Sequence, residues 1–269
     1  MPTINANDFI VRDLNISLSD RPTQINLFED KKAAKHHIKE NAIAISDMAH
    51  KLYGEAKQSI IILLQGMDTS GKDGTTKSLF HRTPPLNVNV AGFKSPTKTE
   101  LAQDYLWRVH QVCPAKGEMT VFNRSHYEDV LVVKVREFAP LDAVEKRYEQ
   151  INDFERMLTE NGTTVLKFML HISPEVQAER LKDRLINPDK RWKFNPNDLE
   201  DRKLWLQFMD AYQTMLRRTS TKHAPWHVIP SDDKKTRGAI IGSIVLDKLK
   251  EMNPSYPDTG YRLADFEIQ

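Results

Sequence analysis

The sequence contains a single cysteine, which excludes an internal disulfide framework and a zinc site built from several cysteines. No run of 18 apolar residues occurs, and the first ten residues, MPTINANDFI, do not have the layout of a signal peptide. We therefore expect a cytoplasmic protein without a membrane segment.

Neither sign of charge is in marked excess, because 39 Lys and Arg face 37 Asp and Glu in 269 residues, a formal net charge of +2. Such a balance argues against a general nucleic-acid coat, and we expect no nucleic-acid partner. A hydrophobic fraction of 39% is ordinary for a globular protein of one large or two small domains.

Short apolar runs alternate with segments that favour helix, which predicts a parallel sheet with helices on both faces. The expected strands are residues 59–65, 87–93, 119–122, 164–171 and 226–229. The expected helices are residues 31–53, 97–114, 141–161, 173–187, 198–218 and 234–253. This is a three-layer α/β/α fold around a five-stranded parallel sheet. We expect an arm and helix over residues 1–57 to pack on a catalytic domain formed by residues 58–269.

A phosphate-binding loop follows the first predicted strand, in the stretch GMDTSGKDGT. It has the G-x-x-x-x-G-K pattern between a strand and a helix, the context in which backbone N–H groups and a lysine surround a phosphate. An ordinary glycine turn is the alternative. The candidate phosphate-binding residues are Gly66, Thr69, Ser70, Gly71, Lys72, Asp73, Gly74 and Thr75.

Two carboxylates set this loop apart from the common form. Asp73 stands where Ser or Thr usually binds Mg²⁺, and Asp68 lies inside the loop. Because two anions beside a polyphosphate repel it, we infer one or two Mg²⁺ ions between them, for which Mn²⁺ could substitute. Asp68 is the preferred ligand, or else a group that orients the nucleophile. Asp73 could instead complement the dipole at the start of the next helix.

A basic segment between residues 180 and 193 carries six cations against two anions in a nearly neutral chain. Asn187-Pro188 interrupts its helix, which predicts a hinge-flanked lid at about residues 180–215 that binds phosphate oxygens and excludes water. A solvated helix face is the alternative. The candidate lid residues are Arg180, Arg184, Lys190, Arg191 and Lys193.

Several motifs together resemble the polyphosphate kinase 2 family over roughly residues 28–250. They are GMDTSGKDG, DYLWRVH, FNRSHYEDVLVVKV, NPDKRWKFNPNDLEDRKLW and HAPWHVIP. The FNRSHYED form is most similar to the class III branch, whose members phosphorylate AMP and ADP with inorganic polyphosphate.

The resemblance implies a P-loop kinase-like core with a helical lid, Mg²⁺ dependence, and a nucleotide opposite a polyphosphate channel. Relatives suggest a homo-oligomer, either dimer or tetramer. By match to the family motifs, the catalytic-centre positions are Asp68, Gly71, Lys72, Asn123 and Arg124.

The third predicted strand departs from the family at Asn123, where many members carry Asp. Glu128 or Asp129 could then supply the missing negative charge, so the candidate metal ligands are Asp68, Glu128 and Asp129. Lys94 follows the second strand, where nucleoside monophosphate kinases hold their acceptor. The candidate nucleotide-binding residues are therefore Lys94, Arg124 and Glu128.

We expect the chain to transfer the terminal phosphoryl group of polyphosphate to AMP or ADP, giving ADP or ATP. GMP and GDP stay open as acceptors because no base-reading motif is recognisable. An ATP-dependent nucleoside monophosphate kinase on the same core is the alternative, and Asp73 in place of Ser or Thr counts against it.

Overall fold

Five parallel strands form one sheet in this computed structural model, which describes residues 2–13, 15–262 and 266. Their order across the sheet is β2-β3-β1-β4-β5. The bounds are β1 Ser59–Gln65, β2 Val88–Gly92, β3 Met119–Asn123, β4 Thr163–His171 and β5 Trp226–Pro230. The five-stranded parallel sheet expected from the sequence is confirmed.

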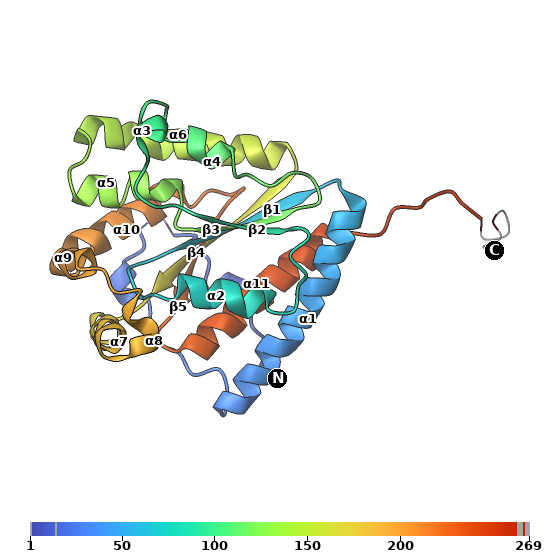
Figure 1. The fold of residues 1–269 in the computed structure, drawn as a ribbon, viewed down its shortest axis with the longest axis horizontal. Coiled ribbons are helices and arrows are strands. Elements are labelled where there is room, and N and C mark those ends of the chain that lie inside the picture. Colours follow the sequence, from blue (N-terminus) through green and yellow to red (C-terminus); the bar gives the residue numbers. More distant parts are fainter. Residues whose placement is uncertain (1, 14, 263–265, 267–269) are drawn as a thin grey trace.

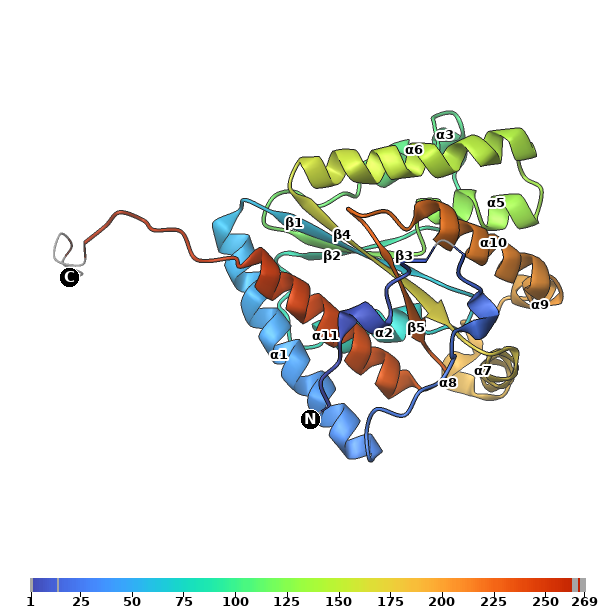
Figure 2. The ribbon, with the colours of Figure 1, turned by 180° about the vertical axis from the view of Figure 1, so that it is seen from behind.

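Helices cover both faces of the sheet (Figures 1 and 2). The side chains of β1 alternate between two cores, with Ile61 and Leu63 in one and Ile60, Ile62 and Leu64 in the other. This period of two is that of a strand buried on both faces. The first core is closed by α6 (Leu141–Glu160) and α10 (Trp205–Thr219), and the second by α1 (Lys31–Glu55) and α11 (Lys234–Met252).

Two of the expected helices are divided in the structure. The segment 97–114 holds only α3 (Lys98–Leu101) and α4 (Trp107–His110), because Asp104 caps a new turn by accepting from the backbone N–H groups of Leu106 and Trp107. The segment 198–218 divides into α9 (Asn197–Lys203) and α10. The helix expected over residues 31–53 extends two residues further, because α1 continues to Glu55 and ends on the left-handed Ala56.

The N-terminal arm lies against the edge of β5 (Figure 2). Ile10 forms an antiparallel bridge with His227, and the Val11 backbone N–H donates to the Trp226 carbonyl at 2.8 Å. Its 3-10 turns, η1 (Ala6–Asp8) and η2 (Leu18–Asp20), accompany buried apolar side chains such as Phe9. The arm therefore completes the core, although its sequence is polar and shows little periodicity.

At the carboxyl ends of β1 and β3, the chain passes into α2 (Lys72–Phe80) and into the turn η3 (His126–Asp129), which leads to α5 (Val132–Val135). The segment after β4 forms α7 (Pro174–Ile186), α8 (Pro188–Arg191) and α9 beside these ends (Figure 1). The fold thus places three sequence motifs beside the carboxyl ends of the strands. None of the helices in the described ranges combines the length and the hydropathy of a membrane span.

Candidate active site

The loop between β1 and α2 has the strand–loop–helix geometry predicted for phosphate binding. Gly71 is the N-cap of α2 with φ 105°, and a Cβ there would collide with the guanidinium of Arg237. The Lys72 ammonium folds back over the loop, donating to the Gly66 carbonyl at 2.7 Å and the Met67 carbonyl at 3.3 Å. Burial, reinforced by Arg124, lowers the pKa of Lys72 to about 8.

Arg237 on α11 supports this loop and was not predicted from the sequence. Its buried guanidinium donates to the Ser70 carbonyl at 2.9 Å and to the Thr75 hydroxyl at 3.0 Å. Burial lowers the pKa of Arg237 to about 10. An arginine among helix formers is typical of a solvated face, so no local pattern indicated this long-range contact.

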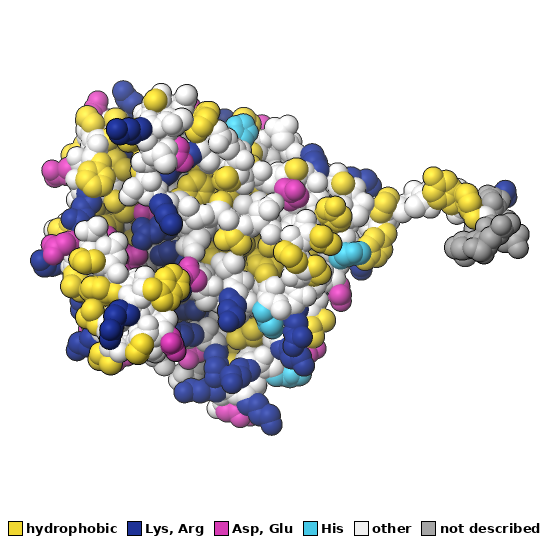
Figure 3. All heavy atoms as spheres, viewed as in Figure 1, with side chains coloured by type: hydrophobic (Ala, Val, Ile, Leu, Met, Phe, Trp, Pro, Cys, Tyr) yellow, Lys and Arg dark blue, Asp and Glu magenta, His cyan; other side chains and the backbone are white. Residues whose placement is uncertain are grey.

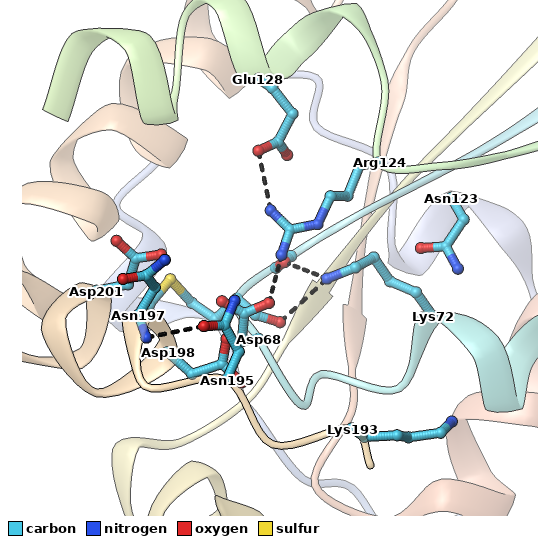
Figure 4. Close-up of polar contacts among 12 residues, drawn as sticks. Asp68, Lys72, Asn123, Arg124, Glu128, Lys193, Asn195, Asn197, Asp198 and Asp201 are labelled. Atoms are coloured by element: carbon cyan, nitrogen blue, oxygen red, sulfur yellow. Dashed lines mark hydrogen bonds and ion pairs between the residues drawn. The ribbon is translucent and has the colours of Figure 1, made fainter. Parts of the chain in front are cut away.

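Arg124 joins the phosphate loop to the end of β3 (Figure 4). Its guanidinium contacts Asp68 at 2.5 Å and Glu128 at 3.1 Å. These two carboxylates, Glu128 above all, raise the pKa of Arg124 and keep it charged. Gln65 at the end of β1 holds Glu128 in place by donating to its carboxylate, and Ser125 donates to the Gln65 side chain at 3.2 Å.

Asn123 and the lid residue Lys193 meet on the same carboxylate of the phosphate loop. The Asn123 amide donates to Asp73 at 2.7 Å, and the Lys193 ammonium lies 2.8 Å from the other Asp73 oxygen. The hydrogen bond from Lys193 is the main cause of the lowered pKa of Asp73. An Asp at position 123 would repel Asp73, whereas the amide donates to it.

The predicted lid segment is attached to the phosphate loop through Arg180 on α7. Its guanidinium donates to the backbone carbonyls of Thr69, Ser231 and Asp232 at 2.9, 2.9 and 2.6 Å. Arg184, one turn later, pairs with Asp198 on α9 at 2.8 Å. These arginines therefore bind other elements, rather than forming the solvated helix face that was the alternative.

These elements enclose a cleft of about 380 Å³. Eight basic side chains line it against three acidic ones, a local excess in a chain of net charge +2. Figure 3 shows Lys and Arg side chains gathered between α2 and the lid, and again at the start of α1. The charged residues lining the cleft are Asp68, Lys72, Asp73, Arg124, Arg180, Asp183, Arg184, Lys190, Lys193, Lys234 and Arg237.

Of the predicted site residues that do not line this cleft, Asp129, Lys94 and Arg191 also lie outside the phosphate loop and its contacts. Asp129 faces Arg147 on α6 at 3.2 Å, and burial raises the pKa of Asp129 to about 6. Lys94 offers its carbonyl to Arg108, and Arg191 donates to a carbonyl at the end of α7. The structure does not bring these side chains to the phosphate loop.

The three predicted metal ligands do not form one cluster. Arg124 separates Asp68 from Glu128, and Asp129 is turned away toward Arg147. Over the described ranges, no group of three or more His, Cys, Asp or Glu is arranged to hold a metal ion. Like Asp201, Asp198 on the lid lies within range of the Asp68 charge; burial and then that charge raise the pKa of Asp198 to about 6. The sequence analysis did not select it.

Comparisons with known proteins agree on one family. The family model described as Polyphosphate kinase 2 matches residues 28–257. The chain is 46% identical over 237 residues to the AMP/ADP-polyphosphate phosphotransferase of Meiothermus ruber, covering 88% of this chain and 89% of that protein. It is 35% identical over 257 residues to the ADP-polyphosphate phosphotransferase of Rhodopseudomonas palustris, covering 91% and 89%.

A solved structure has the same fold. The crystal structure of polyphosphate kinase 2 from Arthrobacter aurescens superposes with a TM-score of 0.92 at 35% identity, covering 97% of this chain and 94% of that one. The P-loop kinase-like architecture predicted from the motifs is thereby confirmed.

Proposed function

Because the chain belongs to the polyphosphate kinase 2 family, we propose that it transfers the terminal phosphoryl group of inorganic polyphosphate to AMP and ADP, giving ADP and ATP. The observation that carries this proposal is the cleft, where eight basic side chains surround a phosphate loop. The name of the Meiothermus ruber relative, which is 46% identical over 237 residues, includes both AMP and ADP. The ATP-dependent alternative finds no support in these comparisons.

The reaction needs positioning and charge compensation more than a strong base. A terminal oxygen of the acceptor phosphate, already anionic, attacks the end phosphorus of polyphosphate as the bond to the bridging oxygen breaks, and that oxygen keeps the electron pair. We assign Lys72 and Arg124 to stabilise charge on the transferring group, and Asp68 to hold Arg124 in position. Asn123 orients Asp73 at the start of α2.

A divalent cation fits the donor set of the cleft. Asp68 and Asp73 both line it, and Mg²⁺ in proteins is bound by one or two carboxylates together with substrate phosphates and water. We propose these two residues as its holders, with Glu128 acting through Arg124 and Mn²⁺ able to substitute. When bound, the ion would neutralise charge on the phosphate oxygens.

The segment at about residues 180–215 acts in this proposal as a lid that excludes water, the competing acceptor. Its phosphate-facing residues are Arg180, Arg184, Lys190 and Lys193, all of which line the cleft. Residues 58–269 would form the catalytic domain, with residues 1–57 packed on it. We also propose that the protein forms a homo-oligomer and is located in the cytoplasm.

The donor is tested by incubating the purified protein with Mg²⁺, AMP, and either polyphosphate or ATP, followed by chromatographic separation of the nucleotides. We expect ADP and then ATP from polyphosphate. Phosphorylation of AMP with ATP alone, and none with polyphosphate, would contradict the proposal. Parallel incubations with ADP, GMP and GDP rank the acceptors.

A further inference from the structure

A buried polar network lies directly behind the turn that carries Arg124 and Glu128. Lys167 on β4 is fully buried, and its ammonium donates to Glu155 on α6 at 2.6 Å, to the Tyr127 hydroxyl at 2.8 Å and to the Thr219 carbonyl at 2.7 Å. A lysine ammonium has three N–H groups, so each has an acceptor. The charge is compensated within the core rather than exposed to solvent.

Glu155 is the partner shared by two residues of the turn. One carboxylate oxygen accepts from the Tyr127 hydroxyl at 2.8 Å and lies 3.3 Å from Nε2 of His126, while the other accepts from Lys167. Burial acts to raise the pKa of Glu155, but Lys167 and His126 outweigh it and lower that pKa. A buried charge pair of this kind is costly to disturb and holds its partners in one geometry.

The turn therefore has two sides with different partners. Arg124 and Glu128 face the phosphate loop, where they contact Asp68 and each other. His126 and Tyr127, between them in sequence, point into the core and contact Glu155. Because Arg124 has φ 64°, a conformation that most residues avoid, the turn must be held by its surroundings.

We propose that Tyr127, Glu155 and Lys167 are positioning residues for phosphoryl transfer, which fix the 124–128 turn so that Arg124 meets the phosphate loop. Within the part of the chain that the structure describes, the side-chain hydrogen bonds of Tyr127, Glu155 and Lys167 reach no residue that lines the cleft, so the network meets the cleft through this turn. The network then affects the reaction through Arg124. The expected kinetic effects rest on the proposed function.

Tyr127→Phe tests the link, because it removes one hydroxyl and keeps the ring packed against Trp226. Tyr148→Phe is the matched control, since Tyr148 is an equally buried tyrosine in the same core whose hydroxyl has no hydrogen-bond partner among the described residues. We expect Tyr127→Phe to lower kcat on the order of tenfold, with KM for both substrates changed less than about twofold. Tyr148→Phe should leave both constants unchanged.

A combined variant separates positioning from general loss of stability. If Tyr127 acts through Arg124, adding Tyr127→Phe to Arg124→Lys should lower kcat no further than Arg124→Lys alone. Multiplicative losses in the combined variant, or equal losses in Tyr127→Phe and Tyr148→Phe, would overturn the proposal.

Hydrogen exchange followed by mass spectrometry tests the same link without using activity. In Tyr127→Phe, peptides that span residues 124–130 should exchange at least about tenfold faster, while those of β1 keep their rate. Unchanged exchange in the turn would overturn the proposal. If wild-type protein fails to use polyphosphate, the proposed function fails and this measurement still decides the role of the network.

Should Tyr127→Phe not fold, His126→Phe replaces it in all three measurements. That change removes the other side-chain contact between the turn and Glu155 and preserves the ring packing against Phe154. The same outcomes then support or overturn the proposal.

Discussion

Asp68 and Arg124 form the contact on which the proposed chemistry most directly depends, at 2.5 Å between the phosphate loop and the end of β3. Asp68→Asn removes the negative charge with little change in shape. We expect kcat to fall by at least about 10²-fold, because Arg124 loses a charged partner and the proposed cation site loses a carboxylate. Steady-state kinetics with polyphosphate and ADP measure this.

The fold should survive Asp68→Asn, since Arg124 keeps its second carboxylate, Glu128, at 3.1 Å. A melting temperature close to that of the wild type would confirm it. Asp142→Asn, an exposed carboxylate on α6, serves as the control and should retain full activity. Wild-type turnover in Asp68→Asn would exclude the proposed role of this residue.

Lys72 gives the site a defined pH dependence, because burial lowers its pKa to about 8. Below that pH the ammonium is charged and attracts phosphate, and above it the charge is lost. The logarithm of kcat/KM for polyphosphate, which reports the free enzyme, should therefore decline above pH 8. Kinetics between pH 6.5 and 10, values that bracket this pKa, follow the decline.

Lys72→Arg is the control for that profile. The guanidinium stays charged throughout this range, so the variant should lose the decline above pH 8 even where its activity is lower. A decline that persists unchanged in Lys72→Arg would assign it to another group.

At the scale of elements, the phosphate loop is shaped by α11 as well as by its own sequence. Gly71 has φ 105° and faces the Arg237 guanidinium, so Gly71→Ala introduces both backbone strain and a collision. We expect a loss of roughly 2 kcal/mol or more in the free energy of unfolding, together with most of the activity. Urea denaturation and kinetics test both.

Gly74, three residues later in α2, is the matched control. A Cβ there would lie 3.4 Å from the nearest Arg237 nitrogen, and its φ is not in the left-handed region. Gly74→Ala should leave the free energy of unfolding unchanged or raise it by up to about 1 kcal/mol, as expected for alanine in a helix. Equal losses at both glycines would contradict the role given to Gly71.

The lid reaches the phosphate loop through Lys193 and Asp73, both partly exposed. Lys193→Met should raise KM for polyphosphate several-fold and leave the melting temperature unchanged, because exposed ion pairs contribute only about 0–1 kcal/mol. Lys203→Met, which removes an exposed lid lysine paired with Glu200, is the control. An unchanged KM in Lys193→Met would separate the lid from substrate binding.

The elements of the sheet could be predicted because their apolar runs are local and continuous, as in Ser59–Gln65. The single helix predicted over residues 97–114 was wrong because the cap formed by Asp104 competes with continuation of the helix. The strength of that cap depends on the geometry of its hydrogen bonds. The contacts of Arg237 and of the Lys167 network were not predicted, for a related reason. The partners described above lie 12 to 167 positions away in the chain, and no local pattern encodes them.

At the scale of the whole molecule, the net charge of +2 conceals a strongly uneven distribution. Eight basic groups line one cleft, and they come from the phosphate loop, the 124–128 turn, the lid and α11. The near-neutral composition describes the average surface, so its argument against a general nucleic-acid coat concerns that average alone. It could not reveal a cleft assembled from segments far apart in sequence.

The central claim, transfer from polyphosphate to a nucleotide in this cleft, is tested most directly by ³¹P NMR of the purified protein with polyphosphate, ADP and Mg²⁺. We predict that polyphosphate phosphorus is consumed as the γ-phosphate signal of ATP appears in equal amount. Release of inorganic phosphate without ATP, or an unchanged spectrum, would contradict the account.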